Sequence, residues 1–308
     1  MAQGSCRAEF LDSSVSLRMT GGTMRKPTST VCRVTTAWLI ALLAVMGLVT
    51  PTHAEPAADE ALRPIPNRFM TWNTNGQGLG TPESIMEQVR RFRPQVVAFQ
   101  ESCQDEVIEA VNRLRQEGLE YRYRRGFSAV HLGCEAGLGT GIIFAEGTSV
   151  RAHNRKGYSE DEGWLEARGI QSFTTRIDGQ WVRVFNTHLS APGHERLRQL
   201  QARELADATR PHPRALVLGD LNTRPWIAKV MEPIWSAGFK DVDQFCGPVA
   251  DRRCNKTLPK TDDAKFDYIL HRRVNSGGCR LHTPTEDHRI VISDVTLADV
   301  PRPVCTVT

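Results

Sequence analysis

The stretch Leu218-Gly219-Asp220-Leu221-Asn222-Thr223 directly follows an apolar run, residues 215–218, that has the character of a buried strand. Gly219 turns the chain and places a carboxylate and a carboxamide two positions apart. Residues i and i+2 of an extended segment point to the same side, so Asp220 and Asn222 can face one phosphate or one metal-bound water together. Asp and Asn also favour ordinary turns, so the meaning of this motif depends on the other polar residues of the chain.

The first 54 residues have the features of an export signal. A basic segment, residues 25–33, precedes an apolar stretch at 37–49, and small residues follow that suit cleavage after Ala54. The apolar stretch is too short to span a bilayer, which disfavours the alternative of an uncleaved membrane anchor. Met24 lies just before this signal and is an alternative start codon. We therefore predict a secreted protein, and leave open whether it is released or stays with the envelope.

Cleavage after Ala54 leaves 254 residues, enough for one substantial domain. This part holds 34 Lys/Arg and 33 Asp/Glu, so its net charge is +1 and the basicity of the whole chain comes mostly from the signal. A surface that coats nucleic acid is therefore disfavoured, although local basic clusters are compatible with this balance. Residues 55–67 are rich in Ala, Pro and charge without periodicity, so we expect a flexible leader there and the folded domain over 68–308.

Six cysteines follow the signal. An even number of cysteines in an exported protein is typical of disulfides, but six cysteines allow 15 pairings. A bridge between Cys246 and Cys254 is plausible because it would close a short loop. No Cys-x-x-Cys motif and no zinc-like spacing occur, so we expect structural disulfides. The six residues are Cys103, Cys134, Cys246, Cys254, Cys279 and Cys305.

Strand-like and helix-like segments alternate after residue 68. Thr81-Pro82 is a good helix start, and the apolar stripe that follows it indicates an amphipathic helix. Asp178-Gly179 between two apolar arms predicts an antiparallel hairpin, which fits a regular doubly wound sheet poorly. We therefore expect two packed sheets with helices outside. The expected strands lie at 69–73, 96–101, 142–144, 170–177, 181–185, 216–218, 266–270 and 290–295, and the helical stripes at 85–92, 107–114, 197–205 and 227–234.

Several of these segments end in, contain or follow a carboxylate, an amide or an imidazole. The residues concerned are Asn73, Glu101, His188, Asp220, Asn222, Asp267, Asp287 and His288. Taken singly, some have simpler explanations: Glu101 could be a helix-entry charge, and His188 a partly buried structural histidine. Asp267 is harder to explain in this way, because a carboxylate inside an apolar strand needs a partner. The joint occurrence of these residues at strand ends favours a site.

This set of residues suits phosphoryl chemistry. A carboxylate such as Glu101 can hold a hard cation through oxygen, and Mg²⁺ needs only one or two protein carboxylates. The cation stabilises charge on the phosphoryl and leaving oxygens. His288 can take a proton from the attacking water while Asp267 fixes its tautomer. His188 and Asn222 can donate to the phosphate as negative charge builds up, so the expected cofactor is Mg²⁺, with Mn²⁺ as a substitute.

Six short motifs occur in one order along residues 68–298. They are Trp72-Asn73, Gln100-Glu101, Asn186-Thr187-His188-Leu189, Gly219-Asp220-Leu221-Asn222, Phe266-Asp267-Tyr268-Ile269-Leu270 and Asp287-His288. Together they resemble the endonuclease/exonuclease/phosphatase superfamily, which includes pancreatic-type deoxyribonucleases, abasic-site endonucleases, neutral sphingomyelinases and inositol polyphosphate 5-phosphatases. The resemblance implies a four-layer α/β sandwich, with two packed mixed β-sheets flanked by helices, and a catalytic domain over 68–308 that hydrolyses phosphate esters with a divalent metal.

The resemblance also implies roles for individual residues on the metal side of the site. Asn73 and Glu101 match the metal-site residues, with Glu101 as the direct ligand, and Asp287 matches a metal-side carboxylate. His288 matches the general base, and Asp267 matches its carboxylate partner.

On the phosphate side, His188 matches the phosphate-contacting histidine of the deoxyribonuclease-like branch. Asp220 and Asn222 match the pair that orients the nucleophile or a second metal. Arg168 is loosely similar to a phosphate-binding arginine. The family often has Ser before the final Asp-His pair, whereas this chain has Glu286, an added carboxylate that can alter metal affinity.

The resemblance therefore implies a secreted, metal-dependent phosphoric ester hydrolase. DNA is the favoured substrate because His188 fits the deoxyribonuclease-like branch. A phospholipid or inositol phosphate is the alternative within the same family, and a catalytically silent binding module on the same scaffold is the alternative from another class. We expect a monomer without an obligate protein partner. The segment Tyr121–Arg125 forms either a basic-aromatic patch or a solvated strand.

Overall fold

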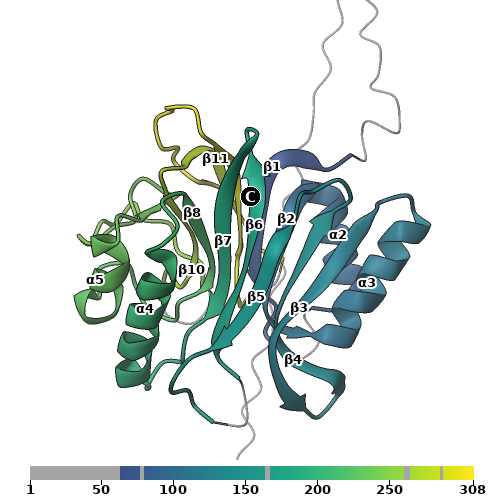
Figure 1. Ribbon diagram of the computed structural model, residues 1–308, viewed down its shortest axis with the longest axis horizontal. Helices are drawn as coiled ribbons and strands as arrows, with labels where there is room; N and C mark the ends of the chain where they lie inside the picture. Colours follow the sequence, from purple (N-terminus) through teal and green to yellow (C-terminus); the bar gives the residue numbers. More distant parts are fainter. Residues whose placement is uncertain (1–62, 77–79, 164–166, 260–263, 285–286) are drawn as a thin grey trace, which may run out of the picture. The chain divides into compact units, whose positions relative to one another are not determined.

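The computed structural model describes residues 63–76, 80–163, 167–259, 264–284 and 287–308, and these residues form two mixed β-sheets (Figure 1). The first sheet has the order β13 (Thr306–Val307), β11 (Asn275–His282), β12 (Ile290–Thr296), β1 (Ile65–Asn73), β2 (Pro94–Cys103), β4 (Cys134–Ala145), β3 (Tyr121–His131). The second has the order β5 (Arg151–Gly157), β6 (Gly169–Ile177), β7 (Gln180–His188), β8 (Ala215–Asp220), β10 (Asp267–Arg272), β9 (Lys240–Asp241). The predicted signal, residues 1–54, lies outside the described part.

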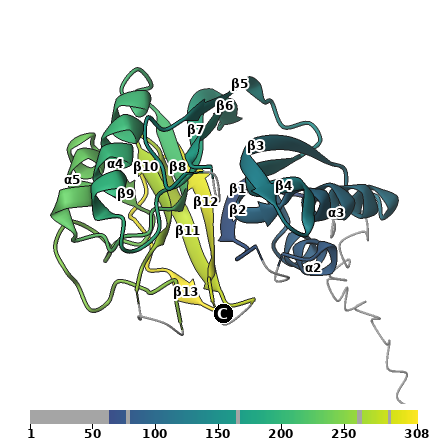
Figure 2. The same ribbon diagram turned by 90° about the horizontal axis from the view of Figure 1, so that it is seen from below.

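Helices cover the outer face of each sheet, as Figures 1 and 2 show. The helices α2 (Pro82–Phe92) and α3 (Gln104–Gln116) pack on the first sheet, and α4 (Glu195–Thr209) and α5 (Ala228–Ser236) pack on the second. Successive strand residues alternate between layers: Phe69 lies in the core between the sheets, whereas Met70 lies in the core beneath α2 and α3. The expected four-layer α/β sandwich is therefore confirmed.

The directions of the strands bring the site motifs, which lie at strand ends and strand beginnings, to one edge of the sheets. β1 runs parallel to β2, and β7 runs parallel to β8, so their carboxyl ends lie at matching levels within each sheet. β12 is antiparallel to β1, and β10 is antiparallel to β8. The beginnings of β10 and β12 therefore lie beside the ends of β8 and β1, which gathers residues that are distant in sequence.

The first strand begins earlier than the sequence indicates. Ile65 lies opposite Pro94, and its backbone N–H donates to the carbonyl of Arg93 at 2.7 Å. Residues 65–67 therefore belong to the sheet, and the leader expected over 55–67 was too long at its carboxyl end. Pro66 and Asn67 show no apolar pattern, so the sequence gives no sign of a strand here. Pairing with the neighbouring strand β2 defines this part of β1.

Three cysteine pairs lie at disulfide distance, with Cα–Cα separations of 5.4 Å for Cys103–Cys134, 4.7 Å for Cys246–Cys254 and 4.5 Å for Cys279–Cys305. The expected Cys246–Cys254 pair is thus present. Such pairs are typical of chains that mature in an oxidising compartment. No helix within the described ranges is both long enough and apolar enough to cross a bilayer.

Gly219, in the motif that opens the site, has a backbone conformation that other residues rarely adopt, with φ of 142°. A Cβ atom there would lie 1.9 Å from the carbonyl oxygen of Thr187 on the neighbouring strand β7. We expect Gly219→Ala to lower the free energy of unfolding by about 1–3 kcal/mol, because buried overpacking is costly. Urea unfolding measures this, with Gly277→Ala as the control, since a Cβ at Gly277 has 3.6 Å to its nearest neighbour. Equal stability of the two variants would contradict the expectation.

Candidate active site

The predicted site residues come from both sheets and meet at one edge. Asn73 ends β1, and Glu101 lies two residues before the end of β2. His188 and Asp220 end β7 and β8. Asp267 begins β10 directly opposite Asp220, so the two carboxylates are paired across adjacent strands. His188 and Asp220 are likewise neighbours across β7 and β8. The sheet register therefore accounts for the gathering of these groups.

Asn73 joins the two sheets at this edge. Its side-chain amide donates to Oε1 of Glu101 at 3.0 Å and to Oδ2 of Asp220 at 3.0 Å. The first contact stays within one sheet, whereas the second crosses to the other. Both Asn73 and Asp220 are buried, so these hydrogen bonds are shielded from water. One amide thus fixes the spacing between two carboxylates that belong to different sheets.

Asn222 and His188 form the next part of the site. The Nδ2 atom of Asn222 lies 2.9 Å from Nε2 of His188 and donates to the carbonyl of Leu189 at 3.0 Å. The backbone N–H of Asn222 donates to Oδ1 of Asp220 at 2.7 Å. Nε2 of His188 lies 3.6 Å from Oδ2 of Asp220 and 3.7 Å from Oε1 of Glu101. The side chains predicted to contact phosphate therefore surround the same carboxylates that Asn73 connects.

Asp267 and His288 form a buried pair. Nδ1 of His288 lies 2.9 Å and 3.1 Å from the two carboxylate oxygens of Asp267, which is fully buried. This hydrogen bond places the proton on Nδ1 and leaves Nε2 directed elsewhere. Nε2 lies 4.0 Å from Oδ2 of Asp220. The imidazole thus has one nitrogen fixed by a carboxylate and the other facing the centre of the site.

Burial and charge shift the pKa values of this cluster in a consistent direction. Burial, together with repulsion from Asp267, raises the pKa of Asp220 above its ordinary value. Burial alone would lower the pKa of His288, but attraction to Asp267, the hydrogen bond to it, and the charges of Asp220 and Asp287 outweigh burial and raise this pKa to about 10. The cluster therefore carries an excess of negative charge that favours a bound positive charge.

Two site residues adopt left-handed backbone conformations that are uncommon for residues other than glycine. Glu101 has a φ of 47°, and Asn222 has a φ of 50°. The backbone at Glu101 accepts hydrogen bonds from Gly76 N–H at 2.9 Å and from the Thr74 hydroxyl at 2.9 Å. Such conformations persist where the surroundings enforce them, and they are frequent at functional sites.

The donor set fits the divalent cation that the family implies. Asp220, Asp267 and His288 each offer one ligand atom, and these atoms lie within 4.8 Å of one another. Glu101 adds a carboxylate that is held next to Asp220 through Asn73. Carboxylate oxygens in this number suit a hard cation such as Mg²⁺ or Mn²⁺. Glu101, the ligand predicted from the sequence, is not a member of this group of three, but it is joined to Asp220 through Asn73.

Two further predicted residues have other partners. The Asp287 carboxylate accepts a hydrogen bond from the side-chain amide of Asn75, which follows β1. The guanidinium of Arg168, just before β6, pairs with Glu162 at 3.2 Å. Since Ile170 lies opposite Thr187 in an antiparallel pair, Gly169 is level with His188, and Arg168 is level with the following residue, Leu189. Glu286, the departure from the family pattern, lies outside the described residues.

Sequence reasoning missed a set of buried amides beneath the site. Nε2 of Gln100 donates to Oδ1 of Asn186 at 2.8 Å, and Nδ2 of Asn186 contacts Oε1 of Gln171 at 3.2 Å. Gln100 belongs to the first sheet, whereas Asn186 and Gln171 belong to the second. Gln100 and Asn186 belong to two of the short motifs, but in the sequence they look like polar residues at strand ends, and nothing indicates that they contact each other. Asn75, two residues after Asn73, was also missed.

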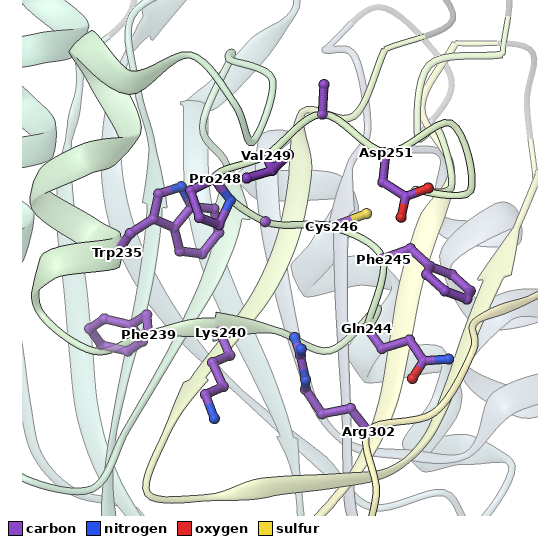
Figure 3. Close-up of a pocket in the computed structure, with 12 residues that line it drawn as sticks. Trp235, Phe239, Lys240, Gln244, Phe245, Cys246, Pro248, Val249, Asp251 and Arg302 are labelled. Carbon is purple, nitrogen blue, oxygen red and sulfur yellow. The ribbon is translucent and has the colours of Figure 1, made fainter.

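A separate hollow of about 340 Å³ lies beside β9 (Figure 3). It is lined by aromatic rings, by the loop that the Cys246–Cys254 pair closes, and by the basic side chains of Lys240 and Arg302. None of the predicted site residues lines it.

The Asp267–His288 pair generates a titration prediction. In the metal-free protein, we expect the imidazole of His288 to titrate near pH 10, and Asp267→Asn to move this titration to a much lower pH. The substitution removes the largest attraction for the imidazolium and leaves burial, which lowers the pKa, as the dominant influence. NMR of the histidine ring protons measures the shift, with Asp251→Asn, a partly exposed carboxylate paired with Arg253, as the control. A titration that stays near pH 10 without Asp267 would contradict the assignment.

Comparison with known proteins agrees with this geometry. The model of the Endonuclease/Exonuclease/phosphatase family matches residues 70–288. A humanised TDP2 from D. rerio has a TM-score of 0.60 at 17% identity, with 74% of this chain and 98% of that chain covered. The human Nocturnin catalytic domain with bound sulfate has a TM-score of 0.59 at 20% identity, with 76% and 95% covered.

A family protein from Bacteroides vulgatus gives a TM-score of 0.60 at 17% identity, with 75% of this chain and 98% of that chain covered. At these identities the structural likeness establishes the fold alone. The comparison with curated proteins finds no match. The family match extends over more than two thirds of the sequence, from β1 to the Asp287-His288 pair. The chain therefore belongs to the endonuclease/exonuclease/phosphatase family of phosphoesterases.

Proposed function

We propose that the protein is a secreted, divalent-metal-dependent phosphoric ester hydrolase that acts on DNA as an endonuclease or phosphodiesterase. The observation that carries this proposal is the meeting of Asp220, Asp267 and His288 within 4.8 Å, next to Glu101 and Asn73. A simple structural role does not require two buried carboxylates on adjacent strands beside a buried imidazole, because each buried charge is costly without compensation.

The roles follow from which atoms face the centre. Asp267 holds Nδ1 of His288, so Nε2 faces the water that attacks phosphorus. A bound cation would offset the carboxylate charges that raise the pKa of His288 to about 10 in the metal-free protein, so that Nε2 could take a proton from that water. Asp220 lies 4.0 Å from that nitrogen and orients the water. We assign His188 and Asn222, whose side chains contact each other at 2.9 Å, to the phosphoryl oxygens on which negative charge develops. Arg168, which is level with Leu189, one position beyond His188, contributes positive charge.

Glu101, Asn73, Asp220 and Asp287 are the residues proposed to hold Mg²⁺ or Mn²⁺. When bound, the cation supplies positive charge that stabilises the phosphoryl and leaving oxygens. The surrounding chain keeps its ligands in place before the cation arrives, since Asn73 fixes Glu101 and Asp220, and Asn75 fixes Asp287.

DNA is the proposed substrate for two reasons. The motif that contains His188 resembles that of the phosphate-contacting histidine in the deoxyribonuclease-like branch. In addition, a similar fold occurs in D. rerio TDP2 complexed with a single-strand DNA product, with a TM-score of 0.57 at 19% identity. A phospholipid or inositol phosphate remains the alternative ester, and a silent binding module remains the alternative from another class.

Export is part of the proposal. The three cysteine pairs support an oxidising environment, which agrees with the signal expected over residues 1–54. In this scheme the folded domain is exported, loses the signal and acts as a monomer outside the cytoplasm.

Substrate assays run side by side test the proposed activity. We expect the purified chain to nick plasmid DNA with Mg²⁺ or Mn²⁺, and EDTA to abolish nicking, because the carboxylate cluster needs a cation. Sphingomyelin and a phosphoinositide are assayed under the same conditions. Hydrolysis of a lipid without nicking would select the alternative substrate, and activity that survives EDTA would remove the metal from the scheme.

The role of His288 is tested by substitution. We expect His288→Ala to lower turnover about 10²–10⁴-fold, the range for loss of a general acid or base, while the thermal melt stays cooperative. The control is His194→Ala, which removes an exposed imidazole at the start of α4 that makes no capping hydrogen bond. Near-normal turnover without His288 would assign the base elsewhere.

A further inference from the structure

The two edge strands β3 and β5 carry an excess of positive charge. Each is the last strand of its sheet, and together they contain six Lys/Arg and no Asp/Glu. Arg122 pairs with Glu146, but the other five are exposed and form no ion pair within the described part of the chain. We call these five the basic edge: Arg124, Arg125, Arg151, Arg155 and Lys156. Since the chain after the signal is nearly neutral, this concentration is local and is not a general property of the surface.

A hollow of about 360 Å³ lies between the two edge strands. It is lined by Arg125, Gly126, Phe127, Ser128 and Arg155. Arg155 donates to the carbonyl of Gly126 at 3.3 Å, which places β5 beside β3. The Arg125 guanidinium donates to the Ser128 hydroxyl at 2.7 Å and 3.0 Å. Each guanidinium is held by these contacts and retains further N–H groups for an anion.

The ring of Phe127, from β3, packs against the second sheet next to the hollow. The ring lies over the backbone of Gly157 and Gly169, where added Cβ atoms would approach the ring to 3.4 Å and 2.6 Å. These two glycines face each other across β5 and β6. The junction between the sheets therefore depends on glycines that leave room for one aromatic ring, and the hollow is a built feature with a fixed wall.

The strand register relates the hollow to the active site. Arg155 lies opposite Gln171, which lies opposite Asn186, two residues before His188. Arg125 lies opposite Gly141, which lies opposite Phe99, two residues before Glu101. Two strand spacings are about 10 Å. A bound strand therefore covers this distance with a few nucleotides at most.

We propose that the hollow between β3 and β5 binds the phosphates of a nucleic acid strand within a few nucleotides of the scissile bond, with the basic edge continuing the path of the strand. This inference rests on the proposed function and adds the position of the flanking strand to it. Guanidinium groups suit phosphate because their fork geometry matches two oxygens. Three observations favour a polyanion that also reaches the active site. The basic edge is positively charged, the guanidiniums of Arg125 and Arg155 are held by hydrogen bonds, and the strand register places the hollow two strands away from Glu101 and His188.

A membrane is the competing occupant. Val130 and Leu132, at the turn that joins β3 to β4, are 91% and 97% exposed, and an apolar tip beside basic residues could meet an anionic lipid surface. The tip lacks the Trp and Tyr side chains that anchor proteins at lipid interfaces, however, and the hollow lies on the strands and not on the turn. The observations therefore favour nucleic acid.

Binding and kinetics of matched variants test the proposal. A labelled 15-nucleotide single strand is titrated in EDTA, where fluorescence anisotropy reports binding without cleavage. We expect Arg125→Glu/Arg155→Glu to weaken binding at least tenfold at low salt and to reduce the slope of log affinity against log salt by about 1.4, the value for two single-strand phosphate contacts. Arg125→Gln/Arg155→Gln is expected to act in the same direction, and it replaces the first variant if that variant does not fold.

The control pair is Lys240→Glu/Arg302→Glu, which makes the same change of charge at the hollow of Figure 3. We expect its DNA binding to fall less than threefold. With Mg²⁺, the β3–β5 variants should raise KM for the oligonucleotide and leave kcat for bis(p-nitrophenyl) phosphate, which is too small to reach the hollow, unchanged. Unaltered DNA binding of these variants, or an equal loss in the control pair, would overturn the proposal.

Two further results separate this inference from its alternatives. Val130→Ser/Leu132→Ser should leave DNA binding unchanged. Binding to phosphatidylserine/phosphatidylcholine vesicles that depends on these residues and on Arg125 and Arg155, without an effect on DNA, would assign the surface to lipid and overturn the proposal. If the unaltered protein hydrolyses neither the oligonucleotide nor bis(p-nitrophenyl) phosphate, the proposed function fails. The anisotropy measurements still decide whether the hollow binds a nucleic acid strand.

Discussion

The hydrogen bond from Asn73 to Asp220 is the contact on which the geometry of the site depends. It joins the end of β1 in one sheet to the end of β8 in the other, across 147 positions of sequence. Just beneath it, the Gln100–Asn186 hydrogen bond makes a second connection between the sheets. Packed apolar faces tolerate small sliding movements, but directional bonds between buried amides and carboxylates do not. The relative height of the two sheets is therefore set by polar contacts, and the carboxylates acquire defined separations as a result.

This arrangement concentrates negative charge where water is scarce. Asp220 and Asp267 face each other on adjacent strands, and both are buried. His288 partly offsets them, which is why its pKa is raised to about 10 in spite of burial. A fold without a function at this edge would gain stability from apolar residues here, since buried charge is rarely favourable on its own. The cluster is thus better understood as a site that is prepared for a positively charged partner.

The sequence predicted the central strands well, because apolar runs that end in polar residues mark them. The strands around Phe69, Val97, Phe173 and Leu216 all formed as expected. The edge strand β5 was missed because Arg151–Gly157 is mostly polar and has no apolar alternation to distinguish it from a loop. Its position depends on pairing with β6, which is a property of the whole sheet.

The same distinction applies to the site residues. His288, Asp267 and Asp220 were identifiable from short motifs, and the structure gathers them at one edge. The identity of their neighbours was not identifiable, because Asn75 contacts Asp287 across 212 positions and Gln100 contacts Asn186 across 86. Tertiary contacts of this range leave no periodic pattern in a single sequence. The division of roles among the oxygen ligands was likewise beyond reach, since it depends on separations between strands.

The Cys103–Cys134 pair has a consequence for when the protein becomes competent. Cys103 lies two residues beyond Glu101, and Cys134 begins the neighbouring strand β4. The cross-link therefore restrains the segment that carries the Glu101 carboxylate. In a reducing compartment this cross-link would stay open, and in an oxidising compartment it would close. The placement of one carboxylate of the site is in this way tied to the redox state of the surroundings.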